Sequence, residues 1–207
     1  LSRNFSNKKS IVLGYSGYAK KPYSFLNKLI RFETVMTALQ YFSYAKLGIP
    51  YMGVGRNLAY RKELFFNNSG FNDHMKVKSG DDDLFINKVA TKENTALCFN
   101  TSSFTMSKPK SSFKDWIYQK RRHVSTSKFY KTLHKFLLGL FFCSQLLFWI
   151  LFVILLIDGY QWQWVLGFTL LRFTIQMVCF GLTAKKFKEL DLVVFAPILE
   201  FFLIFTQ

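Results

Sequence analysis

Apolar residues are spread unevenly along this chain, and most of them crowd into its last third. Apolar runs over about 136–157, 162–182 and 190–206 each approach the roughly 20 residues that a helix needs to cross the core of a bilayer. The preceding residues are more polar and are interrupted by charged side chains. The pattern therefore predicts a polar domain over 1–132 and a transmembrane region with three spans over 133–207.

Within the polar domain the pattern alternates between strand and helix signals, which indicates an α/β fold. Apolar residues at three- and four-residue spacing predict helices over 24–46 and 82–90. Residues 57–66 show the same rhythm after a connection that holds Pro50, Gly53 and Gly55. Short strands are expected over 10–15, 95–99 and 103–106.

The formal net charge of +16 would suit a nucleic-acid-binding protein, but its distribution argues against that class. Much of the excess Lys and Arg lies between residues 108 and 135, directly before the first apolar run, and a second basic cluster follows the second run. Positive charge marks the cytoplasmic ends of membrane spans. We therefore expect membrane lipids rather than nucleic acid as partners, a cytoplasmic polar domain, and an outer connection at 158–163.

Residues 111–123 combine aromatic and basic side chains at helical spacing just before the first span. A helix of this kind typically lies in the surface of a membrane. The segment therefore predicts an interfacial helix that ends the polar domain.

Three consecutive carboxylates, Asp81, Asp82 and Asp83, head the predicted helix over 82–90. Like charges packed together hold protons more tightly, which suits a general base or a site for a divalent cation. Carboxylates also favour the positive end of a helix, so the run could equally be a solvated N-terminal cap.

A second candidate group is Gln119, Arg122 and His123 at the end of the interfacial helix. Guanidinium groups can bind a diphosphate through paired hydrogen bonds, and a neighbouring amide can assist them. The alternative is a basic collar that only anchors the chain at the membrane.

A third candidate segment runs from Gly53 to Arg61. Gly55 would let the backbone approach a ligand closely, and Asn57 and Arg61 could bind sugar hydroxyls or phosphate. An ordinary turn between a strand and a helix would show the same residues.

The order of these three groups, followed by apolar spans, resembles the C-terminal half of membrane-bound family 2 glycosyltransferases, the group that includes cellulose and hyaluronan synthases. Residues 53–71 are similar to an acceptor-side Gly-x-Asn-x-Ala-Tyr-Arg pattern that a Gly-Phe pair follows. Gly80-Asp81-Asp82 resembles the motif that carries the catalytic base, and residues 119–123 resemble a Gln-x-x-Arg-Trp motif in which His123 stands in place of Trp.

The resemblance implies a GT-A scaffold and an inverting hexosyl transfer at the cytoplasmic face of the plasma membrane. The donor would be a nucleotide sugar, and the acceptor would be a glycan or a lipid-linked molecule. Asp82 would be the base, supported by Asp81 and Asp83, and Gln119 and Arg122 would lie near the diphosphate or the acceptor entrance. Because His123 stands where the family has Trp, the chain lacks the indole ring that would stack on a sugar, and this departure argues against processive synthesis.

The resemblance also implies a Mg²⁺ or Mn²⁺ ion, whose Asp-x-Asp ligands would lie upstream of this chain. None of the three His and three Cys residues has a companion at zinc-ligand spacing. We therefore expect no metal ligands within these residues, and we expect the chain to be inactive without its missing donor-binding half.

A non-catalytic membrane protein with a basic collar for lipids or a partner is the alternative from a different functional class. Arg172, inside the second predicted span, fits either class. It could face a polar channel, or it could bond to a neighbouring helix or reach toward the membrane surface.

Overall fold

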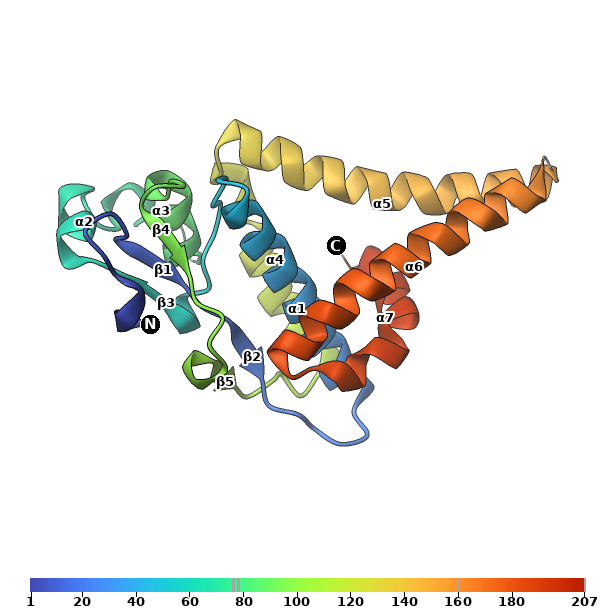
Figure 1. Ribbon diagram of the computed structural model, residues 1–207, viewed down its shortest axis with the longest axis horizontal. Helices are drawn as coiled ribbons and strands as arrows, with labels where there is room; N and C mark the ends of the chain where they lie inside the picture. Colours follow the sequence, from blue (N-terminus) through green and yellow to red (C-terminus); the bar gives the residue numbers. More distant parts are fainter. Residues whose placement is uncertain (76, 78, 160, 207) are drawn as a thin grey trace. The chain divides into compact units, whose positions relative to one another are not determined.

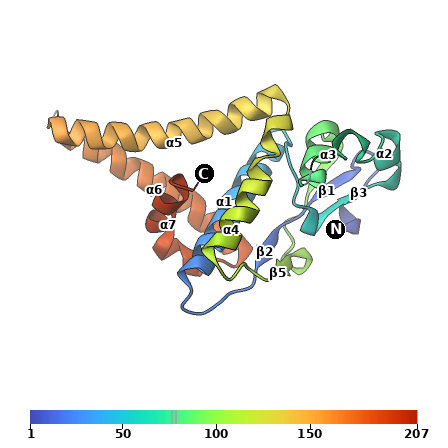
Figure 2. The ribbon, with the colours of Figure 1, turned by 180° about the vertical axis from the view of Figure 1, so that it is seen from behind.

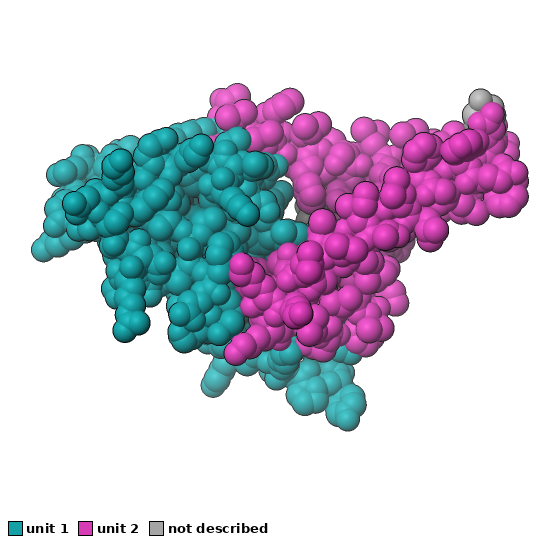
Figure 3. Space-filling model, in the orientation of Figure 1, with its two compact units in different colours: residues 1–131 teal, residues 132–207 magenta. Residues whose placement is uncertain are grey.

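The structure is a computed structural model that describes residues 1–75, 77, 79–159 and 161–206. It divides into two units, residues 1–131 and residues 132–207, which Figure 3 shows in separate colours. This division falls within two residues of the boundary that the hydrophobic pattern predicts. Tyr160, in the predicted outer connection, lies outside the described residues.

The first unit contains two small sheets (Figure 1). Strand β1 (Ile11–Leu13) lies between β3 (Leu58–Tyr60), to which it is antiparallel, and β4 (Thr95–Leu97), to which it is parallel. Strands β2 (Ser16–Tyr18) and β5 (Thr105–Ser107) form a parallel pair. The three residues of β1 are at most 1% exposed, so this central strand lies within the hydrophobic core of the unit.

Helix α1 (Phe25–Lys46) is capped by Ser24, whose hydroxyl accepts a hydrogen bond from the backbone N–H of Asn27 at 3.2 Å. It packs beside α4 (Phe113–Val124), and both views of the ribbon show the two helices side by side (Figures 1 and 2). Glu33 of α1 accepts a hydrogen bond from Trp116 Nε1 at 2.9 Å and pairs with Lys120 Nζ at 2.6 Å. These contacts fix α4 to the unit.

The predicted interfacial helix is therefore anchored partly within the protein. Trp116 is only 4% exposed and lies against α1, whereas Phe113 and Tyr118 remain 50% and 73% exposed. Phe113 and Tyr118, together with Val124 at 52%, keep apolar surface available for a membrane.

The prediction of a helix over residues 57–66 is wrong for the first part of that range. Residues Leu58–Tyr60 form β3, because they pair with β1 in the register Ile11↔Tyr60, and helix α2 is confined to Lys62–Asn67. Helix α3 (Asp81–Val89) follows the prediction closely. The 3₁₀ segments of the chain are η1 (Ser2–Asn4), η2 (Gly55–Asn57), η3 (Asn72–His74), η4 (Thr101–Ser103), η5 (Ser127–Phe129) and η6 (Leu190–Phe195).

Among the residues that the structure describes, two helices of the second unit are long and apolar enough to cross a membrane, α5 (Thr132–Asp158) and α6 (Trp162–Phe187). They form a hairpin with most of their apolar side chains exposed. The third predicted span differs, because residues 190–206 form η6 and then α7 (Ala196–Ile204), whose nine residues are too short to span a bilayer. Pro197 in the first turn of α7 suits a helix start and would break a continuous span.

Arg172 of α6 bonds to neighbouring helices, as one of the alternatives for it requires. It donates to Gln145 Oε1 of α5 at 2.6 Å and to Glu200 Oε1 of α7 at 3.0 Å, and its guanidinium lies 3.9 Å from the Phe148 ring centroid. The ion pair joins α6 and α7, with Glu200 buried and Arg172 partly exposed.

Candidate functional site

Helix α3 presents its three carboxylates in three different surroundings. Asp81 is exposed, Asp82 is half-buried and Asp83 is only 8% exposed. This gradient arises because consecutive helical residues point about 100° apart, so one face of the first turn lies on the core and another in solvent. The structure therefore separates three carboxylates that look equivalent in the sequence.

Asp82 contacts the glycine-rich segment. A Cβ atom placed on Gly55 would lie only 1.9 Å from Asp82 Oδ2, so the backbone at residue 55 touches the carboxylate directly. Proximity to Asp82 also contributes, after burial, to raising the pKa of Tyr60 on β3. Two of the three predicted groups are thus brought together at Gly55, whose missing side chain leaves room for the Asp82 carboxylate.

The residue before α3 contacts the segment that follows α4. Gly80 adopts a left-handed conformation with φ of 78°, and a Cβ there would lie 2.6 Å from Thr126 Cγ2. Thr126 is fully buried, and its hydroxyl donates to the carbonyl of His123 at 2.6 Å. Gly80, which directly precedes the acidic run, therefore lies against Thr126, which in turn bonds to the backbone of His123.

Asp83 lies beneath this surface among buried tyrosines. Burial, with a further contribution from Asp82, raises the pKa of Asp83 to about 7. Tyr51 and Tyr130 are both less than 10% exposed, their rings are 6.2 Å apart, and Asp83 contributes after burial to raising both of their pKa values. Asp83 thus titrates near neutral pH, out of contact with bulk solvent, directly behind Asp82.

Helix α4 brings Gln119, Arg122 and His123 toward the same region. Gln119 Nε2 donates to the Tyr18 hydroxyl on β2 at 3.3 Å. Desolvation lowers the pKa of His123, the neighbouring Arg122 lowers it further, and Asp82 opposes them. The imidazole is therefore within electrostatic range of both Arg122 and Asp82.

Asn57 and Arg61 bind other parts of the protein instead of facing Asp82. The Asn57 side-chain amide donates to the carbonyls of Tyr15 and Ser103 at 2.6 and 2.8 Å, so its N–H groups hold the connection between β1 and β2 to η4. Arg61 donates to the Ser6 carbonyl at 3.1 Å and lies over the Phe5 ring. The structure gives both side chains a role in holding the N-terminal residues of the unit.

Sequence reasoning missed Arg56 and Tyr18. The Arg56 guanidinium lies 4.4 Å from the centroid of the Tyr18 ring, next to the glycine that touches Asp82. Arg56 could have been noticed as the residue between Gly55 and Asn57. Tyr18 had no local signal, because only the fold brings β2 to this place.

Asp81 faces a different feature, an open cavity of about 620 Å³. Aromatic and small polar residues dominate its lining, which comprises Phe65, Phe66, Ser69, Gly70, Phe71, Asn72, Met75, Val77 and Asp81. Asp81 is the carboxylate that borders this cavity, whereas Asp82 is the one that contacts Gly55.

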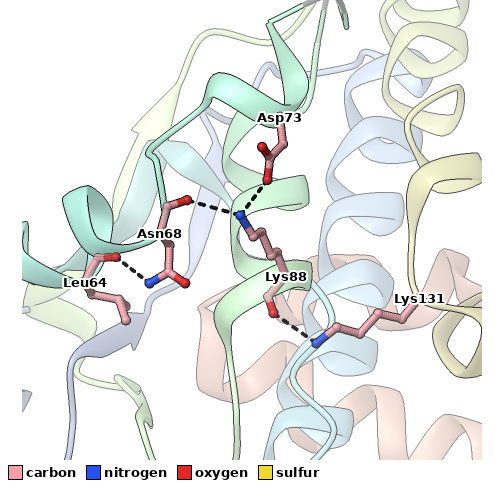
Figure 4. Close-up of polar contacts among 5 residues, drawn as sticks. All are labelled: Leu64, Asn68, Asp73, Lys88 and Lys131. Atoms are coloured by element: carbon pink, nitrogen blue, oxygen red, sulfur yellow. Dashed lines mark hydrogen bonds and ion pairs between the residues drawn. The ribbon is translucent and has the colours of Figure 1, made fainter.

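A set of lysine contacts ties α3 to the segment beside this cavity (Figure 4). Lys88 Nζ bonds to Asp73 Oδ2 at 2.5 Å and to the Asn68 carbonyl at 3.1 Å. Lys131 Nζ donates to the Lys88 carbonyl at 3.1 Å, near the C-terminal end of α3. These contacts fix the C-terminal end of α3 to the segment that carries Asn68 and Asp73 and to Lys131.

A metal site cannot be built from the residues that the structure describes. Within them, no group of three or more His, Cys, Asp or Glu side chains is arranged to hold an ion. The consecutive carboxylates diverge into solvent, toward Gly55 and into the core, so they do not converge on one point. The ion that the resemblance implies therefore does not fit these side chains alone.

Comparison with known proteins gives one result at the level of the family. No curated protein matches the chain. A family model described as glycosyl transferase family group 2 matches residues 4–204, nearly the whole chain and both of its units. The chain therefore belongs to family group 2 of the glycosyltransferases.

Proposed function

We propose that this chain carries the acceptor-activating part of an inverting glycosyltransferase, with Asp82 as its general base. Family membership supports glycosyl transfer from a nucleotide-sugar donor to an acceptor. The observation that carries the finer proposal is the contact of the Asp82 carboxylate with the backbone of Gly55.

In the proposed reaction, Asp82 accepts the proton of an acceptor hydroxyl while that oxygen attacks the anomeric carbon of the donor. The new carbon–oxygen bond forms as the bond from the anomeric carbon to the diphosphate breaks, and the diphosphate leaves with the electron pair. Attack opposite to the leaving group inverts the anomeric centre. The half-buried setting of Asp82 suits this role, because the carboxylate is reachable and is held by the backbone at Gly55.

The surroundings of Asp82 support its choice among the three carboxylates. Asp83 is only 8% exposed, so an acceptor hydroxyl from outside the protein cannot reach its carboxyl oxygens as easily as those of Asp82. Asp81 is exposed and borders the open cavity. We propose that Asp83 influences the charge of Asp82 from its buried position, and that Asp81 lies where the acceptor binds.

The two apolar helices α5 and α6 support membrane association. We propose a cytoplasmic catalytic unit whose acceptor is a membrane-bound glycan or a lipid-linked molecule. The exposed Phe113 and Tyr118 of α4, in a basic segment, would contact the lipid surface. A non-catalytic membrane protein remains the competing function and makes the opposite prediction for Asp82.

The test is the substitution Asp82→Asn in the full-length protein, which keeps the shape of the side chain and removes its basicity. We expect a loss of sugar transfer of about 10²- to 10⁴-fold, the range that general-base catalysis contributes, with membrane insertion and thermal stability retained. Asp158→Asn is a matched control, because Asp158 is exposed and lies at the end of α5. Undiminished transfer by Asp82→Asn would reject the assignment, and Asp81→Asn in the same assay would show whether its neighbour is the base.

A further inference from the structure

Arg56 is exposed, yet it is held in one orientation. Its Nη1 donates to the Gly17 carbonyl at 3.1 Å and its Nη2 donates to the Ser16 carbonyl at 3.4 Å, while the guanidinium lies over the Tyr18 ring. An exposed arginine in solvent normally keeps its rotamer freedom. Here three contacts to β2 remove that freedom before any ligand arrives.

The same guanidinium keeps unused bonding capacity. Of its five N–H groups, the two bonds to β2 occupy two, and Arg56 pairs with no carboxylate among the residues that the structure describes. Its positive charge is therefore oriented but not neutralised by the protein. Such a group is suited to an anionic ligand, because binding requires little further ordering.

Tyr18 connects Arg56 to the predicted binding helix. One side of this tyrosine supports the Arg56 guanidinium, and its hydroxyl accepts the bond from Gln119 of α4. Arg56 follows Gly55 directly, and Gly55 contacts the Asp82 carboxylate. Gln119, Tyr18, Arg56 and Asp82 thus form a series of neighbours that spans four elements, α4, β2, η2 and α3.

A second arginine acts on the same region. Among the groups that shift the pKa of His123 after desolvation, Arg122 and Arg56 lower it, whereas Asp82 and Glu33 raise it. Both guanidinium groups are therefore within electrostatic range of one imidazole, on the side of the site where Asp82 lies. Arg122 lies three residues after Gln119 on α4, on the same face of that helix, and Gln119 bonds to the tyrosine that lies under Arg56. Two guanidinium groups in this region suit a ligand with more than one negative charge.

We propose that Arg56 is a binding residue for the diphosphate of the donor, acting with Arg122 and oriented by Tyr18. The proposal rests on the proposed function for the identity of the ligand. Negative charge grows on the diphosphate as its bond to the anomeric carbon breaks, so an oriented guanidinium there would stabilise the transition state more than the bound donor. Tyr18 is a positioning residue, since it acts through Arg56 and Gln119.

The test uses the full-length protein and inorganic pyrophosphate as the probe, with and without Mg²⁺, and measures binding by titration calorimetry. We expect Arg56→Ala to weaken pyrophosphate binding by about ten- to hundredfold, the range for loss of a hydrogen bond to a charged group. Arg56→Lys keeps the charge without the paired geometry and should recover only part of the affinity. Arg3→Ala, which removes an exposed arginine of η1, should bind like the wild type.

Tyr18 provides a second and independent measurement. Tyr18→Phe keeps the ring under Arg56 and should bind pyrophosphate within about threefold of the wild type, whereas Tyr18→Leu should approach Arg56→Ala. In transfer assays Arg56→Ala should lower kcat more than it raises KM for the acceptor. Wild-type affinity for pyrophosphate in folded Arg56→Ala, or no binding of pyrophosphate by the wild type, would overturn the proposal.

Failure of this proposal can be told apart from failure of the proposed function. Pyrophosphate binding is measured without turnover, so it does not depend on which carboxylate is the base. Loss of transfer in Asp82→Asn, together with equal pyrophosphate affinity in wild type and Arg56→Ala, would overturn the role of Arg56 alone. Normal transfer by Asp82→Asn, with weakened affinity in Arg56→Ala, would reject the base and support the anion site.

Discussion

Replacement of Gly55 by alanine tests the contact on which the proposed site depends. The backbone of Gly55 does not have a positive φ, so any L-residue can adopt its conformation and the effect of the change is steric. The new Cβ would lie 1.9 Å from Asp82 Oδ2, whereas real Cβ contacts essentially never fall below 3.0 Å. The carboxylate must therefore retreat by about 1 Å or rotate away.

A displacement of this size is large for a general base. Misplacing a reacting group by about 1 Å can reduce a rate by roughly 10²-fold, because proton transfer needs hydrogen-bond distance to the acceptor hydroxyl. We expect Gly55→Ala to lower the turnover number for sugar transfer by about 10²-fold. The assay would follow transfer of labelled sugar by the full-length protein in membranes, normalised to the amount of folded protein.

Gly53→Ala is the matched control within the same segment. A Cβ at residue 53 would meet Leu58 Cδ1 at 2.9 Å and Leu13 Cδ2 at 3.0 Å, which are the ends of core side chains that can shift. This variant should lose some thermal stability while keeping the turnover number of its folded fraction. Wild-type turnover by Gly55→Ala, in a protein that Asp82→Asn inactivates, would refute the reasoning that this backbone contact positions the base.

Two further predictions concern buried charges in the two units. Asp83 holds its proton more tightly in the folded protein, so stability of the first unit should fall as pH rises from about 4 to about 7, and Asp83→Asn should flatten this dependence in thermal unfolding followed across that range. An unchanged pH profile in Asp83→Asn would contradict the buried setting of this carboxyl. In the second unit, Glu200→Ala leaves Arg172 bonded only to Gln145 and should destabilise the packing of α7 by about 3–5 kcal/mol, measured by thermal unfolding in detergent. Glu200→Gln keeps a hydrogen-bond acceptor and should lose less, and equal stability of all three proteins would show that the ion pair does not hold α7.

Much of the fold was readable from short stretches of sequence. The apolar runs predict α5 and α6 because a helix long enough to cross a bilayer needs an uninterrupted apolar surface. The rhythm of residues 24–46 and 82–90 predicts α1 and α3 for the same local reason. Residues 58–60 were predicted as helix and form β3 because pairing with β1, far away in sequence, decides their conformation.

The roles within the site depended on the tertiary structure. Asn57 and Arg61 carry groups that bind sugars or phosphates in many proteins, but here they hold backbone carbonyls at Tyr15, Ser103 and Ser6. A residue type shows which bonds a side chain can make, and only its neighbours show which bonds it does make. Arg56 therefore passed unnoticed in the sequence although it adjoins the residue that touches Asp82.

The sequence by itself determined that the chain has a polar unit and an apolar unit, and that an acidic run heads a helix, because these properties depend on neighbouring residues along the chain. Only the tertiary structure decided that Asp83 is buried while Asp82 rests against Gly55, and that Gly80 meets Thr126. Such differences arise from burial and from contacts between segments about 25 to 45 residues apart. No local pattern of residues records them.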